Sequence, residues 1–394
     1  MARATIEIVF FCLSIAPPWI LAWWAERRLV GDEEDDRNLF YRVKSYASWI
    51  SVAPFIALLG SLVILEELHF ITYFICLFAG LALLLLIQEF AFKHLHEKIS
   101  ANPQGLRAIF TSTWSVIVLT LVPLLLYLLV VEGLSLLANL YLSDSWLDER
   151  NIWIWIVILI ALGLSTTAFL TPWVLKVLYR AKRVQEGRFF RAAQKAAGIL
   201  GTEFEGVYLY PDWPAGRAVV LTDLHGKVTA SESLERLLND CELETIALHE
   251  AAHLKNKHLI FLLALSISIG VFSGLMIALG LPLLLEQAEK SLWISQHLGK
   301  WGWIFIAPSM GLLGMLAILA LFFWSMRQME FSADRSAVLH GASREDLVSA
   351  LAKLHQKNLI GSRWTWLDRF FQTHPSLNSR IEQIRKINTE ATRL

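Results

Sequence analysis

The 394-residue chain is 55% hydrophobic and only 18% charged, and its apolar residues come in long uninterrupted blocks. This composition excludes an ordinary soluble domain and indicates an integral membrane protein. The 35 basic and 35 acidic side chains balance, so we expect no nucleic-acid partner and no polybasic membrane-surface patch across the whole chain.

Seven apolar blocks of 17 or more residues contain no charged side chain, so each is long enough to cross a bilayer as a helix. In chain order these blocks cover residues 8–24, 46–65, 70–87, 109–131, 152–175, 259–285 and 303–324. The first block is short, but no small-residue cleavage site follows it, so we expect a retained span rather than a signal peptide. The acidic run at 32–36 is expected to be a solvated loop.

The distribution of basic residues sets the expected topology. Lysine and arginine crowd the loops after the first and third blocks, and the positive-inside rule places these loops in the cytoplasm. The chain then divides into a five-span membrane domain at 1–175, a first polar segment at 176–258, a two-span hairpin at 259–324 and a second polar segment at 325–394. Because the hairpin leaves the membrane and returns, both polar segments lie on the cytoplasmic face and can share one site.

The polar segments have a mixed helix and strand pattern. The first is expected to form a helix at 189–198, strands at 205–210 and 218–222, a short helix at 231–238 and a further helix with Asp240 as its N-cap. The second is expected to form helices at 325–339, 343–356 and 377–387. The expected fold class is a mainly α polytopic membrane protein with about seven transmembrane helices and a small α+β domain split around the last two spans.

The most specific motif is His249-Glu250-Ala251-Ala252-His253, which lies on the helix expected after residue 240. Residues four apart lie on one face of a helix, so both imidazoles can bind a single Zn²⁺ while Glu250 points toward the water that the metal activates. That water is the nucleophile of a zinc peptidase. A small sheet followed by a helix that carries the ligands is also the usual plan of a zincin.

A third protein ligand is expected, because catalytic zinc usually takes three protein groups and one water. Glu330 directly follows the last span, and Asp334 lies one turn later on the same helix face. One helix could therefore supply a ligand together with a carboxylate that orients His249 or His253. The alternative is an exposed acidic face beside Arg327 and Arg335.

The second half of the chain resembles the HtpX and CAAX prenyl endopeptidase family of membrane gluzincins. The resemblance rests on Glu330-x-x-x-Asp334 after a two-span hairpin, with Ala333 and Arg327 beside it, and on His374-Pro375-Ser376-Leu377 with Arg380-Ile381 near the end. It covers about 176 to the end, and five spans before the motif are closer to the CAAX endopeptidases. One departure is Asp212-Trp213-Pro214-Ala215-Gly216, where family members usually carry an Asn-Ala element that pairs with the substrate backbone. Because of that departure, the family's substrate specificity is not carried over to this chain.

The resemblance implies peptide hydrolysis at the cytoplasmic membrane face, with Glu330 as ligand, Asp334 behind a ligand and His374 near the substrate's oxyanion. The expected protein is a zinc metalloendopeptidase with one Zn²⁺ per chain held by His249, His253 and Glu330, and with Glu250 as general base and acid. His374 would donate to the oxyanion or, alternatively, cap the helix after Pro375. The expected partners are protein or peptide substrates, including membrane-associated or lipidated ones, and the lipid bilayer.

Two other functions remain open at this point. An intramembrane protease would bury the motif in a span, but Lys255, Lys257 and His258 argue against it because polar groups are costly in hydrocarbon. We expect His258 to be a histidine at a helix end rather than a ligand. A non-catalytic scaffold or transporter is the second alternative, although the spans carry almost no ionisable residues for a transport path and Glu250 would be superfluous beside a structural zinc.

Overall fold

The computed structural model describes residues 2–64, 70–100, 180–211, 218–275, 299–360, 362 and 372–387. Within these ranges the protein is mainly helical with a small mixed sheet, as the sequence predicts. The expected spans at 109–131 and 152–175, the second part of the block 259–285 and the departure at 212–216 lie outside the described residues. Among the helices that are described, none combines the length and the mean hydropathy needed to cross a membrane.

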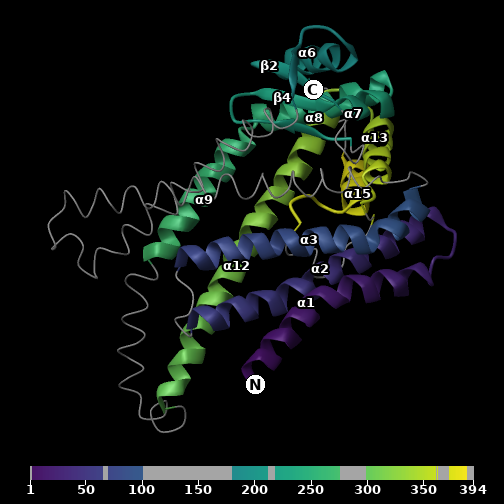
Figure 1. Ribbon diagram of the computed structural model, residues 1–394. Helices are drawn as coiled ribbons and strands as arrows, with labels where there is room; N and C mark the ends of the chain where they lie inside the picture. The colour runs from purple at the N-terminus through teal and green to yellow at the C-terminus, as the bar shows by residue number, and fades with distance from the viewer. Residues whose placement is uncertain are drawn as a thin grey trace.

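The described residues between 2 and 100 form a group of three long helices, α1 (Ala2–Glu26), α2 (Glu33–Ile64) and α3 (Phe70–Ser100), which pack against one another (Figure 1). Phe40 of α2 meets Phe92 of α3 edge to face, with ring centroids 5.9 Å apart. The acidic run at 32–36 is not a loop, because residues 33–36 form the first turn of α2. Acidic side chains favour the N-terminal end of a helix dipole, and Asp36 also accepts hydrogen bonds from the backbone of Val30 and Gly31.

A four-stranded sheet lies at the other end of the molecule, with strand order β1-β2-β4-β3. Its strands are β1 (Lys182–Val184), β2 (Gly206–Tyr210), β3 (Val220–Thr222) and β4 (Lys227–Ser231). β2 and β4 are parallel, and the two outer pairs are antiparallel. The turn from β3 to β4 is closed by Asp223, whose carboxylate accepts from the backbone of His225 and Lys227, and by Gly226 at φ +77°. β3 is an edge strand and contacts α8.

Helix α8 (Asp240–Lys255) is the central element among the described residues from 180 onward. Asn239, not Asp240, is its N-cap, because Asn239 accepts from the Glu242 backbone while the Glu242 carboxylate accepts from the Asn239 backbone. Asp240 instead pairs with Arg188 at 2.6 Å. This reciprocal cap fixes the start of the helix about two and a half turns before the first histidine of the motif.

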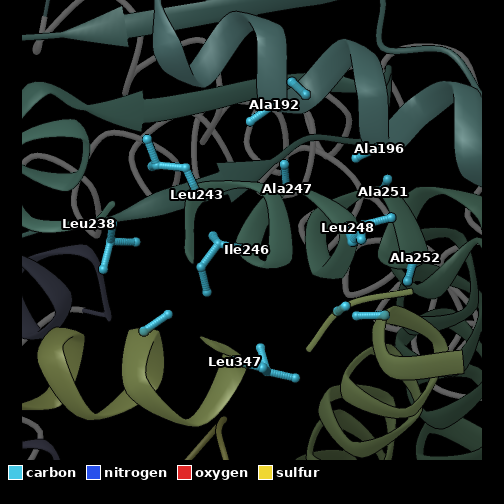
Figure 2. Packing of buried hydrophobic residues seen from close by; sticks show 14 of the residues in the cluster. Ala192, Ala196, Leu238, Leu243, Ile246, Ala247, Leu248, Ala251, Ala252 and Leu347 are labelled. Atoms are coloured by element: carbon cyan, nitrogen blue, oxygen red, sulfur yellow. The ribbon is translucent and has the colours of Figure 1, made fainter. Parts of the chain in front are cut away.

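Small side chains let α6 (Arg188–Leu200) lie close against α8. Figure 2 shows Ala192 and Ala196 of α6 near Ala247 and Ala251 of α8, and helices approach more closely where the side chains between them are small. α7 (Glu232–Leu237) precedes α8, and its Leu234 is fully buried in the same core.

The C-terminal half of the chain completes this core. Its helices are α9 (His258–Leu275), α12 (Gly299–Leu339), α13 (Arg344–Lys357) and α15 (Leu377–Lys386). The expected span at 303–324 and the expected helix at 325–339 are one continuous helix of 41 residues, about 60 Å long. Its C-terminal end packs against α8 (Figure 1), so that Ala333 and Ala337 share a core with residues of α6, α8 and β4.

Candidate metal centre and active site

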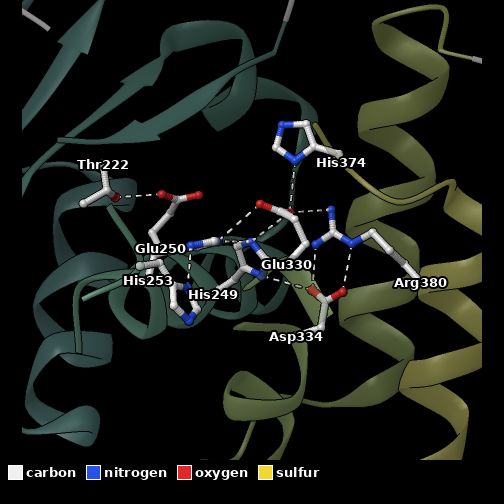
Figure 3. A network of polar contacts seen from close by, with 9 residues as sticks. Thr222, His249, Glu250, His253, Glu330, Asp334, His374 and Arg380 are labelled. Atoms are coloured by element: carbon white, nitrogen blue, oxygen red, sulfur yellow. Dashed lines mark hydrogen bonds and ion pairs between the residues drawn. The ribbon is translucent and has the colours of Figure 1, made fainter. Parts of the chain in front are cut away.

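Three side chains from two helices converge at the centre of the described residues from 180 onward, which we call the catalytic half (Figure 3). His249 and His253 lie one turn apart on α8, and their Nε2 atoms are 3.1 Å apart. Glu330 of α12 faces both, with Oε2 3.6 Å from Nε2 of His249 and Oε1 3.5 Å from Nε2 of His253. Within the described part of the chain, these residues form the group able to hold a metal ion, with all ligand atoms within 4.8 Å of one another.

The spacing and chemistry of this group fit zinc. Four ligands at about 2.0–2.1 Å from a tetrahedral Zn²⁺ lie about 3.3 Å from one another, close to the separations of the three ligand atoms here. Two imidazoles and one carboxylate are also a ligand set of catalytic zinc sites, in which the fourth position stays open for water or substrate.

Asp334 and Arg380 hold the ligands from behind. Asp334 Oδ1 lies 3.0 Å from Nδ1 of His249, the ring nitrogen that faces away from the ligand group. Arg380 of α15 donates to both carboxylate oxygens of Asp334, at 2.8 and 2.6 Å, and its Nη1 lies 3.4 Å from Glu330. Asp334 and Glu330 are buried, so the alternative of an exposed acidic helix face is excluded. A carboxylate behind a histidine ligand fixes its tautomer and raises its basicity.

The electrostatics of the pocket favour a positive charge between the carboxylates. Burial opposes a charge on His249, but hydrogen bonds to Asp334 and Glu330 outweigh burial and raise the pKa of His249 above its usual value. Burial and the neighbouring His249 lower the pKa of His253. Although burial opposes ionisation of Glu330, His374 and His249 lower its pKa well below the usual value. The pocket therefore holds an ionised carboxylate that attracts a cation.

Glu250 lies beside the ligand group with its carboxylate buried. Burial raises the pKa of Glu250, which makes its carboxylate a stronger base than an exposed glutamate. Thr222, at the end of edge strand β3, donates a hydrogen bond to Glu250 Oε2 at 2.7 Å (Figure 3). The hydrogen bond from Thr222 thus holds the Glu250 carboxylate in its position beside the ligand group.

His374 approaches the group from the segment that precedes α15. Its Nδ1 lies 3.1 Å from Glu330 Oε2, and its side chain is 64% exposed. The alternative role as a helix cap is wrong, because the N-cap of α15 is Ser376, whose hydroxyl accepts from the Ser379 backbone. The backbone beside His374 is held by Arg327, which donates to the carbonyl of Gln372 at 3.1 Å.

Comparison with known proteins identifies the family of this site. Residues 208–388, which include the whole ligand group, match peptidase family M48. This segment belongs to peptidase family M48. The M48 domain is a zinc metallopeptidase domain, so the protein is a hydrolase. Because the protein is an enzyme, the scaffold and transporter alternatives are excluded. The family expected from the motifs is confirmed.

Curated relatives extend the match beyond the M48 domain. A "Protease HtpX homolog" of Tropheryma whipplei is 25% identical over 295 residues, which are 69% of this chain and 96% of the relative. A second protein of that name, from Acaryochloris marina, is 25% identical over 244 residues, which are 55% of this chain and 78% of the relative. Among solved structures, Ste24p of S. mikatae shares the fold with a TM-score of 0.57 and 15% identity, over 96% of this chain and 99% of that one.

The M48 domain brings together all six residues singled out in the sequence, namely His249, Glu250, His253, Glu330, Asp334 and His374. Sequence reasoning missed three further members. Thr222 could not be placed because a short edge strand gives no signal of what it faces. Arg380 had a signal, since it is a charged residue within the motif near the end of the chain. His258 lies at a helix end, as expected, but its contact with His253 was not foreseen: the Nδ1 atoms of the two rings lie 2.9 Å apart.

Proposed function

We propose that this protein is a membrane-embedded zinc metalloendopeptidase that hydrolyses proteins or peptides at the cytoplasmic membrane face. The observation that carries the proposal is the triangle of ligand atoms from His249, His253 and Glu330 with the buried carboxylate of Glu250 beside it. A structural zinc site has no use for a basic carboxylate next to its ligands, whereas a hydrolytic site requires one.

One Zn²⁺ per chain would be held by Nε2 of His249, Nε2 of His253 and the Glu330 carboxylate. When bound, the metal supplies Lewis acidity that lowers the pKa of a water molecule and polarises the scissile carbonyl. Asp334 keeps the proton of His249 on Nδ1, so the lone pair of Nε2 stays available to the metal. Arg380 in turn keeps Asp334 ionised and oriented.

Glu250 is the general base of the proposed reaction. It takes a proton from the attacking water and delivers that proton to the leaving amine. Its raised pKa suits this double task, because a group that must accept and then donate a proton works best when its pKa approaches the working pH. The exposed ring of His374 donates a hydrogen bond to the oxyanion of the tetrahedral intermediate, a contribution of about 3 kcal/mol in comparable sites.

The membrane setting is supported by the seven uncharged blocks in the sequence and by the excess of basic residues in the first and third loops. The fold that this chain shares with Ste24p supports an arrangement of helices around the M48 domain like that in Ste24p. Substrates that reach such a site include membrane-associated or lipidated proteins and peptides. Resistance of the expressed protein to alkaline carbonate extraction, with epitopes in 325–394 accessible only from the cytoplasm, tests the setting. Extraction by carbonate would contradict it.

Replacement of the base separates metal binding from catalysis. In detergent-purified protein, we expect Glu250→Gln to retain stoichiometric zinc and to lose cleavage of casein by about 10²-fold or more. The matched control is Glu244→Gln, a glutamate on the same helix that pairs with Lys195 at 2.6 Å. The control should retain both zinc and activity. Undiminished cleavage by Glu250→Gln, or folded wild-type protein that binds no zinc, would contradict the proposed function.

A further inference from the structure

Helix α8 does not continue into α9, and the break between them lies directly behind the metal centre. α8 ends at Lys255, and Lys257 adopts φ +53°, a left-handed conformation that residues other than glycine rarely adopt. In an uninterrupted helix, residue 258 would lie about 140° around the axis from residue 253. The break instead brings His258, the first residue of α9, back against His253.

His258 and His253 meet through their Nδ1 atoms, which lie 2.9 Å apart. Their ring centroids are 4.9 Å apart and their planes are inclined by 80°. His258 is 7% exposed, so solvent has little access to this contact. The other nitrogen of His253, Nε2, faces His249 and Glu330. His258 therefore contacts His253 on the side that faces away from the ligand group.

The distance between the two nitrogens dictates the positions of the protons. Two ring nitrogens at hydrogen-bond distance require that one carries a proton and the other accepts it. A neutral His253 that binds metal through Nε2 carries its proton on Nδ1, so Nδ1 of His258 is the acceptor. His258 then carries its own proton on Nε2 and is neutral. One contact thus fixes the tautomers of both rings.

We propose that His258 is a positioning residue that accepts the Nδ1 hydrogen bond of His253 and fixes the tautomer and ring orientation with which His253 binds zinc. This inference rests on the proposed function. Metal-binding histidines usually donate to a carboxylate, a backbone carbonyl or water, and Nδ1 of His249 lies 3.0 Å from a carboxylate oxygen of Asp334. A neutral imidazole in this role adds no further negative charge to a pocket that already buries three carboxylates.

The test compares three substitutions at this position. Phenylalanine keeps the ring but removes the acceptor, asparagine places its amide oxygen near the position of Nδ1, and glutamine reaches about as far as Nε2. Zinc affinity of the detergent-purified protein is measured by competition with a chelator. We expect His258→Phe and His258→Gln to bind zinc about 10- to 100-fold more weakly, and His258→Asn to recover much of the loss. Activity of His258→Phe should return in excess zinc, unlike that of Glu250→Gln.

The matched control is His340→Phe, which removes a helix-end histidine whose Nδ1 lies 2.8 Å from the Ser336 carbonyl. Zinc affinity of the control should equal that of the wild type. Wild-type zinc affinity in all three His258 variants would overturn the inference. A zinc affinity of His258→Asn as low as that of His258→Phe would also overturn it, as would equal affinities of His258→Gln and His258→Asn. If His258→Phe does not fold, the asparagine and glutamine variants decide. Failure of the wild type to bind zinc would instead overturn the proposed function.

Discussion

Each residue of the metal centre is restrained by a second side chain, and Arg380 restrains two of them. It contacts Asp334 through two nitrogens and Glu330 through a third, and it is buried. A planar guanidinium can meet both oxygens of one carboxylate and still reach a second group, whereas the ammonium of lysine acts as a point charge. The orientation of Asp334, and through it that of His249, therefore depends on the planar shape of the Arg380 guanidinium and not only on its positive charge.

We therefore expect Arg380→Lys to weaken zinc binding by about 10- to 100-fold, although it conserves the charge. Chelator competition measures the loss. Arg385→Lys, a change of the same kind at an exposed position of the same helix, is the control and should leave zinc affinity unchanged. Equal affinities in both variants would show that Arg380 contributes only charge.

Replacement of His374 tests whether its ring donates the hydrogen bond to the oxyanion. Because the side chain is 64% exposed, its replacement should have little effect on the free energy of unfolding. We expect His374→Phe to lower kcat by about 10²-fold with little change in KM, since the hydrogen bond forms only in the transition state. Zinc content is measured in parallel. A loss of zinc without a loss of kcat in the loaded enzyme would mean that His374 serves Glu330 instead.

At the scale of elements, the start of α8 carries a buried ionic cluster. The Glu242 carboxylate accepts hydrogen bonds from the Asn239 backbone, the Ser349 hydroxyl and Lys353. Burial opposes its ionisation, but these hydrogen bonds outweigh burial and lower the pKa of Glu242. The cluster therefore ties the first turn of α8 to α13 across the core of the catalytic half.

The lowered pKa gives the direction of a pH effect. Stability from ionised Glu242 is fully present above its unfolded-state pKa of about 4.3 and is lost as the pH falls through the lower pKa of the folded state. We expect Glu242→Gln to reduce the free energy of unfolding by about 1–3 kcal/mol at pH 7, and the difference from wild type to shrink below about pH 4. Denaturation in detergent at several pH values measures it. Glu244→Gln should change stability by less than about 0.5 kcal/mol, and a Glu242 effect that grows in acid would contradict the assignment.

The helices also show which features of the site could be predicted from the sequence. The motif on α8 was predictable because a spacing of four residues fixes the geometry of two ligands within one helix. Glu330 and Asp334 were predictable for the same reason. The two hydrogen bonds from Arg380 to Asp334 join residues 46 positions apart and arise from tertiary packing, which no local pattern encodes. The position of His258 depends on the left-handed turn at Lys257, where no glycine is present to signal such a turn.

At the scale of the whole molecule, the N-terminal helices support the catalytic half through α2. Glu34 and Asn38 accept hydrogen bonds from Ser362, and the Tyr41 hydroxyl accepts from the Gln372 side chain at 2.8 Å. Gln372 lies two residues before His374, so α2 contacts the segment that delivers the exposed histidine. These contacts join parts of the chain more than 320 residues apart, and the sequence contains no sign of them.

We expect Tyr41→Phe to lower kcat by about two- to tenfold, the worth of one hydrogen bond expressed in the barrier, while zinc affinity stays unchanged. Kinetics in detergent with a peptide substrate measure the effect. Tyr46→Phe, one turn and a half further along α2, is the control and should have wild-type kinetics. If both variants match the wild type, α2 has no part in placing His374.

The unbroken course of α12 has a mechanical consequence for the site. Glu330 lies 31 residues from the first residue of this helix, so a change in the tilt of the helix axis moves the third ligand. A tilt of about 5° around the middle of the helix moves residue 330 by about 1.4 Å. A functional site tolerates displacements of only about 0.5 Å. The packing of the C-terminal end of α12 against α8 must therefore hold the helix axis to within about 2° for the third ligand to stay in place.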